Sequence, residues 1–408
     1  MDIALLRKEF PQLQETVYGR PLVYLDNAAT SLRPRSVIAK WDEMSSRYSA
    51  NLHRAVHYTA NVATEEFESA RAAVAAFIGA SDPSEVVFTS GTTQSINLLA
   101  FCLGESLVEE GDEILIAECE HHSDIVPWQL LAERKNLKIK VLPVDERGEL
   151  RIDILPSLLS PRTRLCCVAQ VSNVLGIVNP VKEIARLCHD NGTLLLVDGA
   201  QGVVHCKTDV KALDCDFYAF SGHKIYAAPG TGVLWGRKAL LDKLPPYMGG
   251  GEMIGTVKWA GSTYAEVPYR FEAGTQNIAA VPTLKPALQL VQSLDTKEDN
   301  ERGREVVDFL FDGLQAVDGL HIFGNPRRRG DKIPLFSFAV DGAHHEDLAL
   351  ILDKMGIAVR SGQMCAEPLM DRCGVTGMLR ASFAPYNTID EARYLLESLR
   401  KAINMLRG

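Results

Sequence analysis

The sequence lacks the roughly 18 consecutive apolar residues that a membrane-spanning helix requires. Its first residues, Met1–Lys8, alternate charged and apolar positions and lack the apolar segment of a signal peptide. Neither a Walker A loop nor a GxGxxG dinucleotide fingerprint occurs, and there is no internal repeat. We therefore expect a soluble cytoplasmic protein that has no membrane partner.

Positive charge and patterned cysteines are also scarce. Lys and Arg total 43 against 52 Asp and Glu, and the resulting net charge of −9 does not suit a protein that binds nucleic acid through a basic face. The nine cysteines form no CxxC pair and no metal-like Cys/His spacing. We expect no nucleic-acid partner and no metal, with free thiols in a reducing compartment.

What the chain does contain is an alternation of short apolar runs and amphipathic helical stretches. The runs are Glu85–Thr89, Glu113–Ala117, Ile139–Leu142, Leu165–Gln170, Thr193–Val197, Phe217–Phe220 and Gly232–Trp235. This pattern predicts an α/β fold with a mostly parallel seven-stranded sheet that helices cover on both faces. Ligands of such sheets bind beyond the carboxyl ends of the strands, so motifs that directly follow strands are the candidates for chemistry.

The pattern changes after about residue 281, and 408 residues exceed one ordinary core. We expect a large domain over residues 15–294, and a smaller α/β domain formed by residues 1–14 and 295–408. The elements expected after residue 281 are a helix over 284–294, a charged break over 295–299, a helix near 305–317, strands near 335–340 and 357–360, and a last helix over 389–406.

A lysine follows the end of one apolar run, in Ser221-Gly222-His223-Lys224. A lysine that forms a Schiff base must be partly neutral to attack an aldehyde, and a desolvated strand end favours the neutral amine. Taken alone, a lysine here is more often a surface residue of a loop. Other motifs must therefore support this chemistry.

Asp198 ends another apolar run, where a carboxylate is costly unless it meets a cation. The pyridinium nitrogen of pyridoxal 5′-phosphate (PLP) is such a cation, and an Asp keeps it protonated so that the ring withdraws electrons. Gln201 could reach the phenolic oxygen of that ring. The alternative is an Asp that caps a turn or helix.

Two further motifs follow strands. Ser90-Gly91-Thr92-Thr93 joins a strand to a helix, so backbone N–H groups and hydroxyls could form a phosphate cup; the alternative is an ordinary Thr cap. Glu120-His121-His122 has no third ligand at helical spacing, which disfavours a metal. His121 could instead stack on an aromatic ring and shuttle a proton, unless the pair only caps or faces solvent.

The last candidates are C-terminal. Arg380 lies inside a short expected strand and suits bidentate binding of a substrate carboxylate, although a structural ion pair is the alternative. Arg360 begins a polar loop that leads to Cys365, a setting that permits a reactive thiolate. A buried structural thiol is the alternative for Cys365.

In combination and in order, these motifs are very specific. The stretches concerned are Tyr24–Thr30, Ser90–Thr93, Glu120–His122, Val197–Gln201, Ser221–Lys224, Phe271–Thr275 and Arg380–Ser382. They resemble the cysteine desulfurases of the Suf/Csd type, also called selenocysteine lyases, which are class V aminotransferases with the fold-type I architecture of PLP enzymes. The run Gly374–Arg380 is closest to the Csd branch.

The resemblance implies PLP as the cofactor and L-cysteine as the substrate. Lys224 would form the Schiff base, His121 would stack on the ring, and Cys365 would attack the substrate sulfur and become a persulfide. The implied cofactor-binding residues are Thr92, Thr93, His121, Asp198, Gln201, Ser221, His223, Lys224 and Thr275, and the implied substrate-binding residues are Asn173, Arg360 and Arg380. Thr275 would reach the phosphate across an interface, which implies a homodimer.

The cysteine loop departs from the family in one position. Cys365 keeps its spacing of fifteen residues to Arg380, but Met364 stands where this branch often has His, so a local proton-handling group is lost. Only four residues separate Arg360 from Cys365. This short tether limits reach, so we expect a separate sulfur-acceptor protein, for iron–sulfur cluster assembly or other sulfur-compound biosynthesis.

Two alternatives remain open. Another class V activity, an aminotransferase or a lyase that acts on selenocysteine or cysteine sulfinate, would use the same cofactor residues. Transamination needs a keto-acid acceptor and makes no sulfide, whereas the same protein could accept selenocysteine or sulfinate in addition to cysteine. A non-catalytic PLP-fold scaffold for sulfur carriers would have no need of Lys224, Asp198 and Cys365 together.

Overall fold

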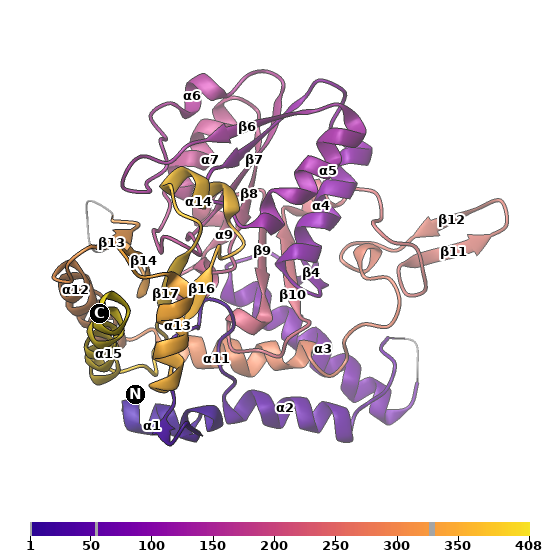
Figure 1. Ribbon diagram of the computed structural model, residues 1–408. Helices are drawn as coiled ribbons and strands as arrows, with labels where there is room; N and C mark the ends of the chain where they lie inside the picture. The colour runs from indigo at the N-terminus through magenta and orange to yellow at the C-terminus, as the bar shows by residue number, and fades with distance from the viewer. Residues whose placement is uncertain (1, 54–55, 326–330) are drawn as a thin grey trace.

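A central seven-stranded sheet lies between layers of helices in the computed structural model, which describes residues 2–53, 56–325 and 331–408 (Figure 1). The strand order is β4-β10-β9-β8-β7-β5-β6. The strands are β4 (Val86–Thr89), β5 (Glu113–Ala117), β6 (Lys138–Leu142), β7 (Thr163–Ala169), β8 (Leu194–Asp198), β9 (Phe217–Ser221) and β10 (Gly232–Gly236). Each expected strand is present, with ends within about two residues, and the predicted fold class is confirmed.

The strand directions place most carboxyl ends at one edge of the sheet. Strands β9, β8, β7, β5 and β6 pair in parallel, whereas β10 runs antiparallel to both β9 and β4. The carboxyl ends of six strands therefore meet at the same edge, beside the start of β10. This is the edge at which ligands of parallel sheets bind.

Helices cover both faces of this sheet, as the alternation of strands and helices predicts. Neighbouring residues of a strand point to opposite faces, and Cys166 and Cys167 in β7 accordingly pack in two different cores. The core of Cys166 includes α3 (Tyr58–Phe77), α7 (Val181–Asp190) and α11 (Leu284–Leu294). The core of Cys167 includes α4 (Thr92–Ser106) and α5 (Val126–Lys135).

The C-terminal part has a separate antiparallel sheet in the order β13-β14-β17-β16, with its own apolar core. Its strands are β13 (Leu320–Phe323), β14 (Leu335–Val340), β16 (Arg360–Gly362) and β17 (Met378–Ser382). Its main helices are α12 (Lys297–Gln315), α13 (His345–Lys354) and α15 (Ile389–Arg407). A smaller α/β unit of this kind agrees with the expected architecture.

The charged break expected over residues 295–299 is wrong from residue 297 onward, where the structure has a helix. Helix α12 begins at Lys297, because the Thr296 side chain accepts a hydrogen bond from the backbone N–H of Asp299 and caps the helix. Glu298 and Asp299 then lie in the first turn, where the helix dipole favours negative charge. The charges that suggested a break are those of a helix start.

The expected strand over 357–360 divides into two short strands. β15 (Ile357–Ala358) pairs in parallel with β3 (Val23–Tyr24), whereas β16 pairs with β17. A segment near the N-terminus is thus joined to the C-terminal unit by backbone hydrogen bonds.

The N-terminal residues pack against both parts of the chain. Leu6, Phe10 and Leu13 belong to the apolar cluster that contains the strands of the central sheet. Phe10 also packs against Tyr386, and Arg7 pairs with Glu391 at the start of α15. The domain boundaries as a whole stay a prediction.

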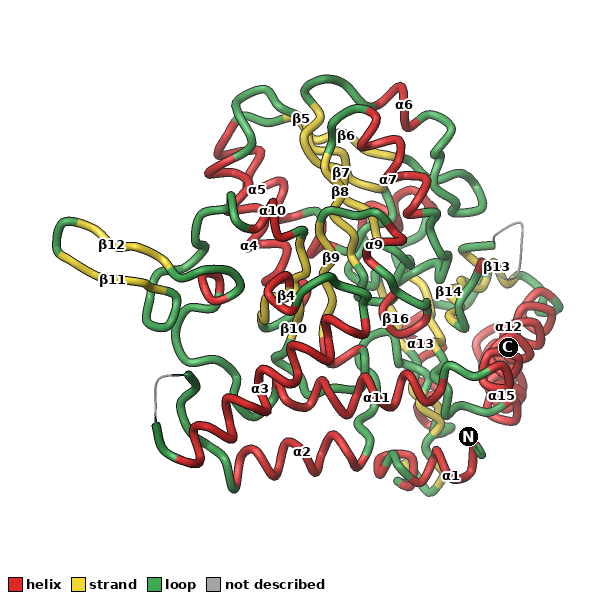
Figure 2. The backbone as a smooth tube through the Cα atoms, turned by 180° about the vertical axis from the view of Figure 1, so that it is seen from behind, coloured by secondary structure: helices red, strands yellow, loops and turns green. Residues whose placement is uncertain are grey.

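The remaining elements connect or flank these units. They are α1 (Ile3–Lys8), β1 (Thr16–Val17), β2 (Arg20–Pro21), α2 (Arg35–Ser46), α6 (Leu155–Leu158), α8 (Gly202–His205), α9 (Val210–Leu213), α10 (Lys238–Leu241), β11 (Ile254–Lys258), β12 (Gly261–Tyr264) and α14 (Glu367–Cys373). The β11–β12 hairpin projects from the body of the protein in both views (Figures 1 and 2). Among the described residues, no helix combines the length and the apolar character that crossing a membrane would take.

Candidate active site

The predicted lysine and aspartate lie at the carboxyl edge of the central sheet. β8 ends at Asp198, and β9 ends at Ser221, directly before the single 3-10 turn Gly222–Lys224. His121 follows β5 and begins another such turn. Arg380, on β17 of the C-terminal unit, also lies near this edge of the sheet, because its positive charge lowers the pKa of Lys224.

Lys224 has an environment that favours its neutral amine. Burial lowers the pKa of this half-buried lysine, and the positive charges of Arg380 and Arg360 act in the same direction. Asp198 and Cys365 act in the opposite direction but do not reverse the shift. The lowered pKa is the property that a Schiff-base lysine needs.

Asp198 is a buried carboxylate whose negative charge is stabilised by few neighbouring groups. It is 6% exposed, and one of its oxygens accepts a hydrogen bond of 2.7 Å from the backbone N–H of Ala200. Burial raises its pKa, and Lys224 partly offsets that rise. A buried carboxylate that faces a site suits a cationic ligand group such as a pyridinium nitrogen.

Two more carboxyl groups lie near enough to Asp198 for its charge to affect their pKa, and the sequence analysis gave them no role. Glu120 is 1% and Asp124 0% exposed; Glu120 accepts a hydrogen bond from Ala169 N (2.7 Å) and Asp124 one from Trp128 Nε1 (2.8 Å). The second oxygen of each carboxyl has no donor among the described residues. Burial and neighbouring carboxylates raise the pKa of both groups well above the usual range, which favours the protonated form of the pair.

The raised pKa values of Glu120 and Asp124 predict that the free energy of unfolding falls as the pH rises. Because the folded-state pKa is raised, the contribution of the pair is most favourable below about pH 4 and is lost as the pH rises above that value. In Asp124→Asn, the amide oxygen can still accept from Trp128, and the amide N–H can donate to Glu120. We expect the free energy of unfolding to rise by about 1–3 kcal/mol at pH 8, and by less at pH 4.

Chemical denaturation at several pH values measures this difference. Asp190→Asn is the control, because Asp190 forms an exposed surface pair with Arg186 in the same domain. An Asp124→Asn protein that is less stable than the parent at pH 8, or that keeps the parent's pH slope, would contradict the shared-proton assignment.

The predicted phosphate cup is assembled at the start of α4. Thr92 donates its backbone N–H to Ser221 Oγ (2.9 Å), and the two hydroxyls share a hydrogen bond of 2.8 Å. The Thr93 hydroxyl bonds to that of Ser123 (2.7 Å). The N-cap residue of α4, Gly91, has no side chain to bond the helix start. Ser221 Oγ accepts from the N–H of Thr92, and the N–H groups that follow suit an anion.

A close backbone contact shapes the cup. A Cβ atom added to Gly232 would lie 2.3 Å from Cα of Gly91, a distance that no real side chain tolerates. Gly232 must therefore lack a side chain for β10 to approach the turn after β4.

The two predicted histidines are neutral. Burial and nearby positive charge, including Lys224, lower the pKa of His121 and of His223 to about 4. His121 Nδ1 accepts a hydrogen bond from the backbone N–H of Ser123 (3.0 Å). Since Nδ1 is the acceptor, the neutral ring carries its proton on Nε2.

The candidate carboxylate clamp contains an acidic residue that the sequence analysis did not assign. Arg380 is 2% exposed and donates to the backbone oxygen of Asn173 (2.8 Å) and to Asp26 (3.2 Å). Arg360 lies 3.7 Å from the other oxygen of Asp26. Arg380 Nε is buried and has no acceptor among the described residues. That open donor suits a substrate carboxylate.

The Cys365 loop is held by its backbone while its thiol is accessible. Among the nine cysteines, all in the described part of the chain, Cys365 alone is exposed. Its carbonyl oxygen accepts from His122 N (2.7 Å), Met364 O accepts from Asn173 Nδ2 (2.9 Å), and Glu367 N donates to His122 Nε2 (3.0 Å). The Met364 side chain is buried in the core of the central sheet. The loop therefore presents the sulfur from a fixed backbone.

Other predicted residues have contacts that leave their roles as predictions. Gln201 Nε2 donates to Ala28 O (2.7 Å), which leaves its second amide hydrogen for another acceptor. His223 Nδ1 lies 3.3 Å from the hydroxyl of Thr30. Thr275 is exposed in a loop that follows Phe271. No group of three or more metal-ligating side chains occurs among the described residues.

Comparison with known proteins identifies the family. Residues 23–395 match the family described as aminotransferase class-V. The chain belongs to that family. It is 41% identical to a probable cysteine desulfurase of Vibrio cholerae over 406 residues, which cover 100% of both chains. It is 44% identical to a cysteine desulfurase of Dickeya dadantii over 402 residues, which cover 98% of this chain and 97% of the relative.

Solved structures agree with this assignment. The crystal structure of the cysteine desulfurase CsdA (S-sulfonic acid) from Escherichia coli has a TM-score of 0.91 and 38% identity, and covers 100% of this chain and 99% of that one. The apo structure of cysteine desulfurase from Thermococcus onnurineus NA1 has a TM-score of 0.93 and 36% identity, with coverage of 99% and 98%. The resemblance found in the sequence, and the fold-type I architecture that it implies, are confirmed.

The residues at the sheet edge fit the PLP cofactor on which this family depends. One end of the site offers a buried carboxylate, Asp198, for a pyridinium nitrogen. The other end offers the N-terminal N–H groups of α4 and the hydroxyls of Thr92 and Ser221 for a phosphate. Lys224 follows Ser221 by three residues, and its positive charge lowers the pKa of Asp198.

Proposed function

We propose that this protein is a PLP-dependent cysteine desulfurase, which takes sulfur from L-cysteine, releases L-alanine and holds the sulfur as a persulfide on Cys365. The observation that carries this proposal is the meeting of an exposed thiol with a lysine of lowered pKa: Cys365 lies near enough to Lys224 to influence that pKa. An aminotransferase would use such a lysine but has no need of the thiol.

Arg380 and Arg360 would orient the substrate. Arg380 would receive the substrate carboxylate through its unpaired Nε and its fork geometry, and Arg360 adds positive charge at the exposed side. Asp26, which lies between both arginines, holds them in place until the substrate binds. The α-amino group of the substrate then points toward Lys224.

Lys224 is the proposed base for the substrate proton, and His121 contributes a hydrogen bond. Bound PLP supplies an electron sink for the substrate carbanion. The neutral amine of Lys224 can accept the proton from the substrate Cα, because burial lowers its pKa. His121 carries its proton on Nε2, and this N–H can donate a hydrogen bond to a group of the cofactor or the substrate.

Sulfur transfer falls to Cys365. Its thiolate attacks the substrate sulfur, so an S–S bond forms and the substrate C–S bond breaks. The bonding electron pair passes to the substrate carbon, which is then protonated and leaves as the methyl group of alanine. The extra sulfur stays on Cys365, where the exposed side chain is open to an acceptor.

A product analysis tests the proposed function. The purified protein with bound PLP is incubated with L-cysteine, alanine and sulfide are quantified, and the Cys365 peptide is examined by mass spectrometry. We expect alanine and a mass gain of one sulfur atom on Cys365. 3-Mercaptopyruvate formed only with an added keto-acid acceptor, and no sulfide, would favour the aminotransferase instead.

Arg380→Lys should separate binding from chemistry. Lysine keeps the charge but cannot present two parallel N–H donors or the buried Nε. We expect KM for cysteine to rise about tenfold or more with a smaller change in kcat, which steady-state kinetics would measure. Arg393→Lys, on the exposed face of α15, is the matched control. A variant in which only kcat falls would contradict the carboxylate role.

Several finer assignments belong to the same proposal. We propose a homodimer, on the support of the exposed Thr275 loop, and an acceptor protein that comes to the anchored Cys365 loop. A cytoplasmic location is supported by nine free cysteines. Selenocysteine and cysteine sulfinate are further proposed substrates, because their cleavage does not strictly require a thiol nucleophile. Iron–sulfur cluster assembly is the proposed use of the sulfur.

A further inference from the structure

We propose that Arg71 and Glu272 are positioning residues, which fix the phosphate cup after β4 and the Thr275 loop relative to one another. This inference rests on the proposed PLP-dependent function. Neither residue is expected to touch the cofactor. The pair would act through the two segments that carry the phosphate-binding hydroxyls.

The pair completes an open edge of the central sheet. β4 is an edge strand, bonded to β10 on one side only. On its other side, Val86 O accepts a hydrogen bond from Arg71 Nη1 (2.8 Å), and Phe88 N donates to Glu272 Oε1 (2.7 Å). The two side chains therefore occupy the place of a neighbouring strand and satisfy backbone groups that would otherwise be buried without partners.

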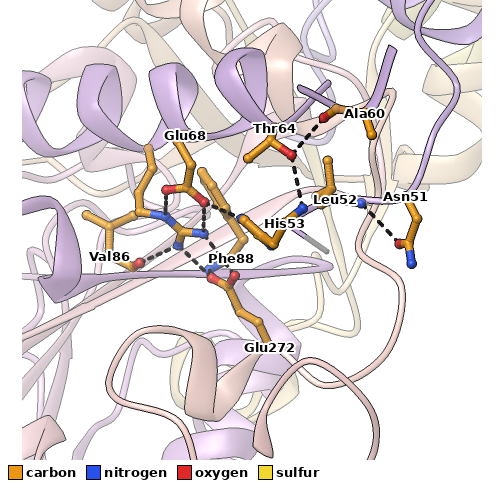
Figure 3. A network of polar contacts seen from close by, with 10 residues as sticks. Asn51, Leu52, His53, Ala60, Thr64, Glu68, Val86, Phe88 and Glu272 are labelled. Atoms are coloured by element: carbon orange, nitrogen blue, oxygen red, sulfur yellow. Dashed lines mark hydrogen bonds and ion pairs between the residues drawn. The ribbon is translucent and has the colours of Figure 1, made fainter. Parts of the chain in front are cut away.

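The geometry of the pair is specific to its two side chains. Arg71 donates to both oxygens of Glu272, at 2.6 and 2.9 Å, and both residues are 2% exposed (Figure 3). The guanidinium also lies over the Phe88 ring, 4.6 Å from its centroid. A buried pair of this kind adds little net stability, because desolvation offsets the attraction. Its defined geometry points to a role in positioning.

An outer layer joins the pair to the surface. Arg71 Nε donates to Glu68 (2.8 Å), which also lies 3.0 Å from His53 Nε2 (Figure 3). Burial raises the pKa of Glu68, but hydrogen bonds from His53 and Arg71 outweigh that effect and lower the pKa to about 2. Glu68 is thus ionised at neutral pH. It accepts from Nε and Nη2 of the guanidinium, whereas Glu272 accepts from Nη1 and Nη2.

Both anchored segments lead directly to the proposed phosphate ligands. Phe88 is followed by Thr89, whose hydroxyl bonds to Ser95 (2.8 Å) and accepts from Gly91 N (3.3 Å) at the cup. Glu272 opens the stretch that ends at Thr275. Because one carboxylate holds both backbones, a change in its geometry would displace both phosphate-binding segments together.

Two variants test this role in the protein loaded with PLP. Glu272→Gln keeps the size of the side chain but removes the charge, and Arg71→Lys keeps the charge but removes the fork. We expect each to release PLP about tenfold faster than the parent and to shift or broaden the ³¹P NMR signal of the bound phosphate. The same full-length variants loaded with pyridoxal, which lacks the phosphate, should release it at the parent's rate.

Arg237→Lys is the matched control, because Arg237 forms a partly buried pair with Asp216 away from the cup. Equal acceleration for PLP and pyridoxal, or an unchanged ³¹P signal, would overturn the proposal in favour of a purely structural role. If both variants fail to fold, Glu68→Gln at the outer layer replaces them, with an expected acceleration of about two- to threefold and the same deciding comparison. A parent protein that binds PLP but makes no alanine from cysteine would refute the proposed function and leave this phosphate test intact.

Discussion

Lys224→Ala is expected to abolish the visible absorption band of lysine-bound PLP and to lower cysteine turnover at least about a thousandfold. Alanine removes the amine that links the cofactor and the base that accepts the substrate proton. The groups whose charges shift the pKa of Lys224 include no second amine; they are Asp198, Arg380, Cys365 and Arg360. Absorbance spectra and alanine formation measure the two losses.

The experiment can distinguish a lost linkage from lost binding. Asp198 and the cup at Thr92 remain in the variant, so phosphate analysis should still find PLP associated without the band. Lys211→Ala is the control, because Lys211 is exposed in the same domain. A Lys224→Ala protein that keeps both the band and the turnover would show that another lysine carries the cofactor.

Cys365→Ala is expected to keep the absorption band and to lose the persulfide, with cysteine turnover reduced at least about a hundredfold. The cofactor residues do not depend on the thiol, whereas sulfur transfer has no nucleophile without it. Activity on selenocysteine should persist to a much larger fraction. Mass spectrometry of the intact protein and quantification of sulfide measure the effect.

Cys373→Ala provides the control for this prediction. Cys373 ends the short helix α14 that follows the same loop, but it is half-buried and burial raises the pKa of its thiol. We expect this variant to retain turnover and the persulfide. Full cysteine turnover by Cys365→Ala would show that the sulfur leaves by another route.

Much of the fold could be predicted because its signals are local. The seven strands of the central sheet are apolar runs of distinct length, and adjacent residues such as Cys166 and Cys167 necessarily face opposite layers. The start of α12 was missed because a run of charges after Thr296 suits both a loop and a capped helix. Only the hydrogen bond from Asp299 to the Thr296 side chain distinguishes them.

The candidate site likewise contains residues that a local pattern predicts and residues that it does not. Asp198 and Lys224 stand out because each follows the end of a strand. Asp26 meets Arg380 across 354 positions, and Arg71 meets Glu272 across 201, so no local pattern reports either pair. Glu120 and Asp124 have visible spacing, but like charges four residues apart suggest a solvated face rather than a shared buried proton.

The hydrogen bonds that fasten the backbone around Cys365 have a kinetic consequence. Because these hydrogen bonds hold the loop backbone, the persulfide sulfur stays where Cys365 lies. Each protomer therefore holds one sulfur atom until an acceptor molecule binds and removes it. Mixing with cysteine alone should therefore give a rapid burst of one alanine per site, followed by a slow phase. The concentration of the acceptor, rather than that of cysteine, would then set the flux of sulfur through the protein.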